Sequence, residues 1–337
     1  MQKTDRVHFL TGRGKLYRRD NNIVFTATDE NGVENGVPKA LPINAIDELY
    51  ITANIETDTN TLCFLADNNT LVHLFTHTGA HRGNIYPNTP NAVNKSGFVL
   101  LQQLRAFDHT EHRLYIAKQI TKGHIRAGIK NLQKYKVDTS LVLSSLEAGV
   151  DAAASIDALM GVEGSFKRGY YEGWNQIVKN QKSFKFTERS KRPPADKINA
   201  LISYFNTRIY NICLSEIYKT ELDPRIGYLH EPNYKSLSLH LDLAEIFKPI
   251  IGDNMIFLML NREEITAKDF ESDAGRLRFT KDAIKKIELK FIAKMTEQIE
   301  VAGTGGQLLT WRQIIRREAN RLKKCICETS EYEPFGV

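Results

Sequence analysis

The chain has 337 residues, of which 42% are hydrophobic and 26% are charged, a composition typical of a globular protein with a large core or two domains. No apolar run approaches the roughly 20 residues of a membrane span, and the N-terminal residues lack the apolar core of a signal peptide. We therefore expect a cytoplasmic protein without a membrane partner. The net charge of +6 is too small to indicate nucleic acid by itself, and the four scattered cysteines are expected to be free thiols.

Residues 1–88 are predicted to form a small β-sandwich domain. Short runs rich in β-branched and aromatic residues alternate there with turn-forming Gly, Asn and Asp residues. Two prolines, Pro87 and Pro90, and little periodicity indicate a linker over residues 89–94. The predicted strands are Val7–Leu10, Asn22–Ala27, Glu48–Thr52, Leu62–Leu65 and Leu71–Phe75.

Beyond residue 95 the hydrophobic pattern changes to a period of 3.6, which predicts an all-α domain over residues 95–337 and an α+β fold class for the whole chain. A stripe from Ile156 to Trp174 predicts one of these helices. Glu163 lies in this stripe where an apolar residue is expected. A buried carboxylate needs a cation or several donors, so Glu163 is a candidate metal ligand, with a simple Arg or Lys ion pair as the alternative.

Three glycines lie in the same predicted helix, at Gly161, Gly164 and Gly169. Glycine is unfavourable inside a helix by roughly 1 kcal/mol relative to Ala. The glycines therefore predict that something approaches the helix backbone closely near Glu163.

Basic and aromatic side chains are interleaved between Lys167 and Arg192. Such a segment can follow a phosphate backbone while its aromatic rings pack or stack, so Lys167, Arg168, Arg189 and Arg192 are candidate DNA contacts. An ordinary solvated basic face is the alternative reading. The interleaved aromatic residues are Tyr170, Tyr171, Trp174, Phe184 and Phe186.

The segment from Asp223 to Pro249 introduces a histidine and two carboxylates into an otherwise apolar run. His230 ends a turn-rich loop, and Asp242 and Glu245 lie three residues apart, on one face of a predicted helix that Pro249 ends or kinks. One imidazole and two carboxylates are suitable ligands for a divalent cation. The alternatives are an ordinary histidine and a solvated acidic face.

Taken together, these motifs resemble the CRISPR-associated endonuclease and integrase family Cas1, over nearly the full chain. The order Glu163, His230 and then the pair Asp242 and Glu245 is similar to the active-site signature of that family. Two positions depart from the pattern: Lys235 stands where Arg is common, and His240, whose role is unassigned, stands where a small or apolar residue is usual. The motifs are Glu163-Gly-Ser-Phe-Lys-Arg-Gly-Tyr-Tyr171, Arg189-Ser-Lys-Arg-Pro-Pro-Ala-Asp-Lys-Ile-Asn-Ala-Leu-Ile-Ser203, Gly227-Tyr-Leu-His-Glu-Pro232 and Ser236-Leu-Ser-Leu-His-Leu-Asp-Leu-Ala-Glu-Ile-Phe-Lys-Pro249.

The resemblance implies a β-sandwich domain used for homodimerisation, followed by a catalytic α-helical domain. It implies that Glu163, His230 and Glu245 bind Mg²⁺ or Mn²⁺, that Asp242 lies close by in the catalytic site, and that Lys235 contacts phosphate. The implied partners are double-stranded DNA, as spacer precursor and as CRISPR repeat, and the small adaptation subunit Cas2. The implied activity is the insertion of spacer DNA into the CRISPR array by transesterification, with nuclease activity when water replaces the 3′-hydroxyl.

Two other functions use parts of the same pattern. A stand-alone metal-dependent DNA repair nuclease would use the same ligands without a companion protein. A DNA-binding protein without catalysis would have the basic face alone, but the buried acid expected at Glu163 argues against it.

Overall fold

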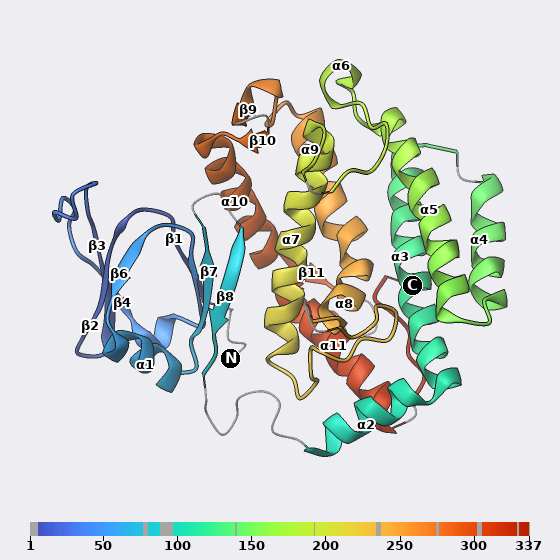
Figure 1. Cartoon of the computed structure of the whole chain (residues 1–337), viewed down its shortest axis with the longest axis horizontal. Coiled ribbons are helices and arrows are strands. Elements are labelled where there is room, and N and C mark those ends of the chain that lie inside the picture. Colours follow the sequence, from blue (N-terminus) through green and yellow to red (C-terminus); the bar gives the residue numbers. More distant parts are fainter. Residues whose placement is uncertain are drawn as a thin grey trace. The chain divides into compact units, whose positions relative to one another are not determined.

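The computed structural model describes residues 6–76, 80–87, 97–138, 140–191, 193–233, 237–273, 276–301, 305–328 and 330–336. The chain divides into two compact units, residues 1–95 and 96–337. Figure 1 shows strands in the first unit, in blue, and mostly helices in the second, from green to red. The predicted α+β fold class is therefore confirmed, while the linker predicted at residues 89–94 lies outside the described residues.

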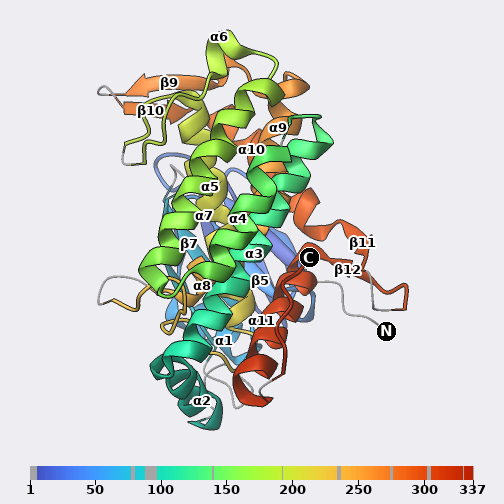
Figure 2. The same ribbon diagram turned by 90° about the vertical axis from the view of Figure 1, so that its right-hand side faces the viewer.

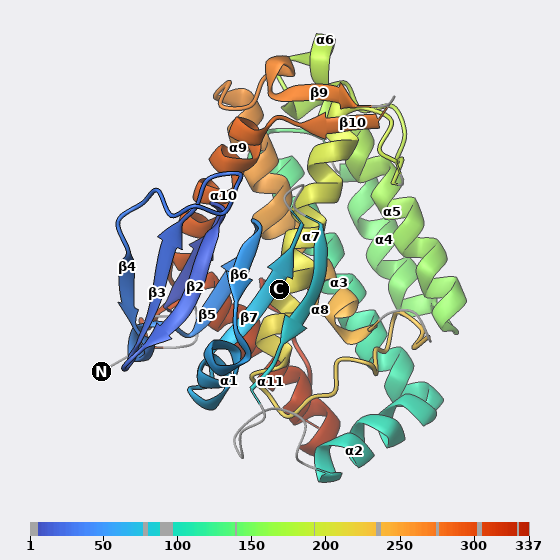
Figure 3. The ribbon, with the colours of Figure 1, turned by 60° about the vertical axis from the view of Figure 1, so that its left-hand side comes forward.

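Two four-stranded sheets build the first unit (Figure 3). Leu16 and Ile23 from one sheet share a buried cluster with Leu49 and Val72 from the other, so the two sheets form the predicted sandwich. One sheet is β1 (Val7–Leu10), β5 (Glu48–Ile51), β7 (Leu71–Phe75) and β8 (His81–Ile85), with β8 antiparallel to its neighbour and the others parallel. The other is β4 (Lys39–Pro42), β3 (Asn22–Ala27), β2 (Gly14–Arg19) and β6 (Ile55–Thr57).

The strand predicted at Leu62–Leu65 is wrong, because these residues lie in helix α1 (Thr59–Asp67). The Asp58 side chain caps this helix by accepting a hydrogen bond from the backbone N–H of Thr61 at 2.8 Å. A four-residue apolar run fits a strand or a short buried helix equally well, and here the cap decided between them.

The second unit is a helical bundle in which α8 packs against both α3 and α7 (Figure 2). None of the described helices combines the length and the apolar character needed to cross a membrane. The helices are α2 (Gly97–Asp108), α3 (Thr110–Lys134), α4 (Ser140–Ala152), α5 (Ile156–Ile177), α6 (Gln181–Phe184), α7 (Lys197–Ile217), α8 (Leu239–Phe247), α9 (Asn254–Asn261), α10 (Lys281–Thr296) and α11 (Trp311–Glu328). The second unit also contains the short elements η3 (Ala267–Asp269), β9 (Phe270–Asp273), β10 (Arg276–Phe279), β11 (Gln298–Glu300) and β12 (Leu308–Thr310), and the first unit contains η1 (Ile43–Ala45).

A π-helical segment, η2 (Lys248–Asp253), follows α8 directly and contains Pro249. Asn131 of α3 donates a hydrogen bond to the Pro249 carbonyl at 2.7 Å. Tyr170 of α5 donates its hydroxyl to the buried Asp253 carboxylate at 2.9 Å. Buried side chains from α3 and α5 therefore hold the turn that places Lys248 beside the end of α8.

Candidate metal centre

Two buried carboxylates from different helices meet where α5 packs near α8. Glu163 of α5 is 5% exposed and Glu245 of α8 is 1% exposed. Lys167, one helical turn after Glu163, places its ammonium group against Oε1 of Glu163 and 3.4 Å from Oε2 of Glu245. The structure thus brings together two of the acids that the sequence singled out.

A third side chain in this cluster, His124 of α3, was not among the predicted site residues. Its Nδ1 lies 3.3 Å from Oε2 of Glu245 and 3.6 Å from Oε1 of Glu163. Burial lowers the pKa of His124 to about 3, so the imidazole is neutral at neutral pH. The sequence could have indicated His124 in the way it indicated Glu163, as a polar residue on the buried face of a helix. His124 lies in a helical row with Ile120 and Gly128 on the buried face of α3.

His230 approaches Glu245 from the other side, and Asp242 sets its orientation. Asp242 is fully buried and accepts hydrogen bonds from the backbone N–H groups of Tyr228, Leu229 and His230 at 2.6, 3.0 and 2.9 Å. It also accepts one from Nδ1 of His230 at 2.7 Å. A carboxylate only accepts, so Nδ1 carries a proton, and the other ring nitrogen, Nε2, lies 3.9 Å from Oε1 of Glu245.

The loop that carries His230 folds tightly at Gly227. A Cβ at Gly227 would lie 2.9 Å from the His230 carbonyl oxygen and from Cβ of Ser238, closer than packed atoms allow. Burial acts to lower the pKa of His230, but the hydrogen bond and charge of Asp242 outweigh it and raise that pKa. The loop and Asp242 together fix the imidazole.

Lys248 completes the surroundings of Glu245. Its ammonium group lies 2.6 Å from Oε1 of Glu245 and 4.7 Å from the centre of the Tyr210 ring. Burial disfavours the charged forms of Glu245 and Lys248 alike. The positive charges of Lys167 and Lys248 outweigh burial at Glu245 and hold its pKa well below the usual value. The pKa of Lys248 is raised by the carboxylate. His240, whose role was unassigned, packs edge-on against Tyr210.

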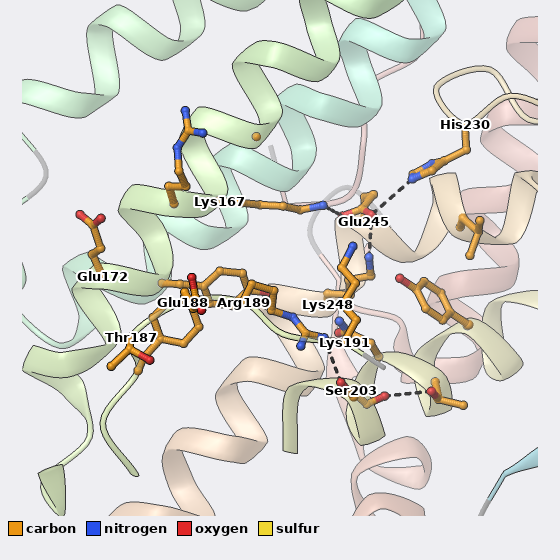
Figure 4. Close-up of a pocket in the computed structure, with 18 residues that line it drawn as sticks. Lys167, Glu172, Thr187, Glu188, Arg189, Lys191, Ser203, His230, Glu245 and Lys248 are labelled. Carbon is orange, nitrogen blue, oxygen red and sulfur yellow. Dashed lines mark hydrogen bonds and ion pairs between the residues drawn. The ribbon is translucent and has the colours of Figure 1, made fainter. Parts of the chain in front are cut away.

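A basic cleft of about 980 Å³ opens beside this cluster (Figure 4). Arg189 is held in its wall by hydrogen bonds to Asn199 and Ser203 at 2.9 and 3.0 Å. The candidate DNA contacts Arg192 and Lys235 lie outside the described residues. The basic residues that line the cleft are Lys167, Arg168, Arg189, Lys191 and Lys248, and His230 and Glu245 line it as well.

Two expectations about α5 and its neighbours can be compared with the structure. Of the interleaved aromatic residues, Tyr170, Trp174 and Phe184 are buried in the core, whereas Tyr171 and Phe186 line the cleft. Apart from the adjacent backbone of α5 itself, no described residue lies within 4 Å of where a Cβ would stand at Gly161, Gly164 or Gly169, and Gly164 lines the cleft.

The residues present fit a divalent cation. The ion pair between Glu163 and Lys167 matches the alternative of a purely structural pair. However, Nδ1 of His124 and Oε2 of Glu245 are buried and make no hydrogen bond to any described residue. Such orphaned buried groups are costly unless something else pairs them. Carboxylate oxygens with imidazole nitrogens form a suitable donor set for Mn²⁺ or Mg²⁺.

The fold and site define a class of protein: a β-sandwich unit followed by a helical unit, with a carboxylate and histidine centre beside a basic cleft. The chain belongs to the Cas1 family, since the model of the family described as CRISPR associated protein Cas1 matches residues 8–292. The predicted family resemblance is thereby confirmed.

Individual relatives agree. A CRISPR-associated endonuclease Cas1 from Clostridium perfringens is 35% identical over 334 residues, covering 98% of each chain. The solved structure of a Cas1 protein from Thermotoga maritima has a TM-score of 0.83 at 28% identity, covering 98% of this chain and 99% of that one. A casposase bound to its integration product shares the fold, with a TM-score of 0.83 at 19% identity, covering 98% of this chain and 93% of that one.

Proposed function

We propose that this chain is a divalent-metal-dependent DNA endonuclease and integrase of CRISPR adaptation, which inserts spacer DNA into the CRISPR array. The observation that carries the proposal is the buried pair Glu163 and Glu245, facing two histidines beside a basic cleft, in a member of the Cas1 family. Glu163, His230 and Glu245 would hold Mg²⁺ or Mn²⁺.

A bound cation would stabilise the charge that develops on the attacked phosphate. The chain's own residues prepare the site. Lys248 neutralises Glu245 and so reduces repulsion of an incoming phosphate. Asp242 keeps Nε2 of His230 turned toward Glu245. Arg168, Arg189 and Lys191 line the cleft, where they would hold the DNA backbone and fix its position without reading sequence.

The proposed reaction is a transesterification. The 3′-hydroxyl oxygen of the incoming DNA forms a bond to a phosphorus atom of the target strand. At the same time the bond between that phosphorus and the 3′-oxygen of the preceding target nucleotide breaks. The attacking hydroxyl gives up its proton and the leaving 3′-oxygen takes one up, so atoms and charge balance. With water as the attacking group, the same site would cleave DNA.

The proposed partners follow from the family: double-stranded DNA, a second copy of the chain joined through the β unit, and Cas2. Homodimerisation through the β unit stays a prediction.

The test is a strand-transfer assay with purified protein, Cas2, spacer DNA and a plasmid that bears the repeat. We expect Glu163→Gln, His230→Ala and Glu245→Gln each to lose nearly all strand transfer and cleavage, because groups that act as a unit do not contribute additively. DNA binding should persist in all three.

Glu111→Gln is the matched control, since Glu111 is an exposed carboxylate in the first turn of α3. Full strand transfer by any of the three site variants would refute the site. Efficient cleavage without Cas2, combined with no strand transfer in its presence, would instead favour a stand-alone repair nuclease.

A further inference from the structure

His124 is a buried imidazole whose Nδ1 faces two carboxylates. It is 3% exposed, and its Nδ1 makes no hydrogen bond to any described residue. The ring lies edge-on to Phe166, with centroids 5.2 Å apart, and its Nδ1 lies within 4 Å of both carboxylates. A histidine with only a packing role would leave this buried nitrogen without a hydrogen bond, which is unfavourable because the nitrogen has lost its water.

The spacing of the surrounding atoms is that of ligands to one ion. Nδ1 of His124, one oxygen of Glu163 and one of Glu245 all lie within 4.8 Å of one another. Bonds of about 2.1 Å to a small divalent cation place neighbouring ligands roughly 3.0–3.5 Å apart. The distances of 3.3 and 3.6 Å from Nδ1 to the two carboxylates are close to that spacing.

The two histidines face different oxygens of the same carboxylate. His230 lies toward Oε1 of Glu245, is 26% exposed at its side chain and lines the cleft. His124 lies toward Oε2, and its side chain is 4% exposed. His124 would bind an ion between the two histidines from the buried interior. The side of the ion that faces the cleft would then be open to a phosphate group.

We propose that His124 is a further metal ligand of this centre, so that two imidazoles and two carboxylates bind the cation. The inference rests on the metal site of the proposed function and adds a consequence for metal choice. Imidazole nitrogen favours transition metals, whereas Mg²⁺ strongly prefers oxygen. The second imidazole therefore makes the site selective for Mn²⁺ and similar ions over Mg²⁺.

The decisive experiment counts ligand nitrogens. Pulsed electron paramagnetic resonance on Mn²⁺-loaded protein detects imidazole nitrogens bound to the ion, and we expect two in the unmodified protein. His230→Ala should retain one, from His124. Because this variant changes a partly exposed residue and leaves His124 intact, the test does not depend on how well His124 variants fold. No coupled nitrogen in Mn²⁺-loaded His230→Ala would overturn the proposal.

Metal affinities give a second readout. We expect His124→Asn to lower the Mn²⁺ affinity by about tenfold or more and the Mg²⁺ affinity much less. Loss of a residue that only supports a metal ligand already costs about tenfold, so loss of a ligand should cost at least as much. A purely structural role would lower both alike, and that result would overturn the proposal. His112→Asn is the matched control, being a histidine of the same helix away from the carboxylates.

Failure of this inference is distinguishable from failure of the proposed function. If Mn²⁺ binds with one coupled nitrogen and the Glu163 and His230 variants lose strand transfer, only the assignment of His124 fails. If no divalent cation binds with or without DNA, both fail.

Discussion

His230 donates its Nδ1–H to Oδ1 of Asp242 over 2.7 Å, and this single hydrogen bond decides which imidazole nitrogen faces Glu245. Asp242 also accepts hydrogen bonds from three backbone N–H groups of the loop, so both of its oxygens act on the position of His230.

Asp242 should therefore behave as a positioning residue. We expect Asp242→Asn to lower strand transfer by about 10- to 100-fold, while His230→Ala loses nearly all of it. The double variant should be no worse than His230→Ala alone, because Asp242 acts through His230. Thermal melting of each protein separates this effect from unfolding. An additional loss in the double variant would show that Asp242 has a separate role.

Lys167 should compete with metal. Its ammonium group lies against the same oxygens of Glu163 and Glu245 that would bind the ion. We expect Lys167→Met to bind Mn²⁺ several-fold more tightly without DNA, since a competing positive charge is removed, and to bind DNA less tightly. Lys182→Met, an exposed lysine of α6, serves as control. Weaker Mn²⁺ binding by Lys167→Met in a calorimetric titration would contradict this view.

The basic wall of the cleft should bind DNA without regard to sequence. Arg168 is exposed and Arg189 is held by Asn199 and Ser203, and both line the cleft. We expect Arg168→Gln and Arg189→Gln each to weaken binding of unrelated duplexes equally and to reduce the slope of log affinity against log salt by about 0.9 per lost phosphate contact. Fluorescence anisotropy over a salt series measures this. An unchanged slope in both variants would rule out phosphate contact by these residues.

The titration of Asp253 should lower the free energy of unfolding as the pH rises. Burial raises its pKa from 3.8 to about 7, although the hydrogen bond from Tyr170 opposes the shift. Between these values the folded protein holds a proton that the unfolded chain has released. This group's favourable effect is therefore complete below pH 3.8 and is lost as pH rises to about 7.

Asp253→Asn removes that dependence. The stability of this variant relative to the unmodified protein should rise between pH 5 and pH 8 by about 3 kcal/mol, since the two pH units below the pKa of about 7 contribute about 1.4 kcal/mol each. Urea unfolding at the two pH values measures the change, and an equal difference at both would contradict the assigned pKa.

Much of this protein could be predicted from patterns within single elements. The change of hydrophobic period from strands to helices indicated the α+β fold, because each period reports which face of an element is buried. Glu163 was found because a carboxylate on an apolar stripe needs a partner. Asp242 and Glu245 were found because three-residue spacing places both on one face of α8. Their assigned roles in metal binding remain predictions.

Tertiary structure alone decided which partners these residues meet. Lys167 of α5 pairs with Glu245, and His124 of α3 lies against it, because the fold brings these helices to Glu245, whereas Lys248 pairs with Glu245 from three residues further along the same stretch of chain. Local spacing does not specify which buried faces of distant helices come together. For the same reason the sequence indicated a carboxylate at Asp242 but left open whether it would face an ion or, as the fold has it, the backbone of the loop that carries His230.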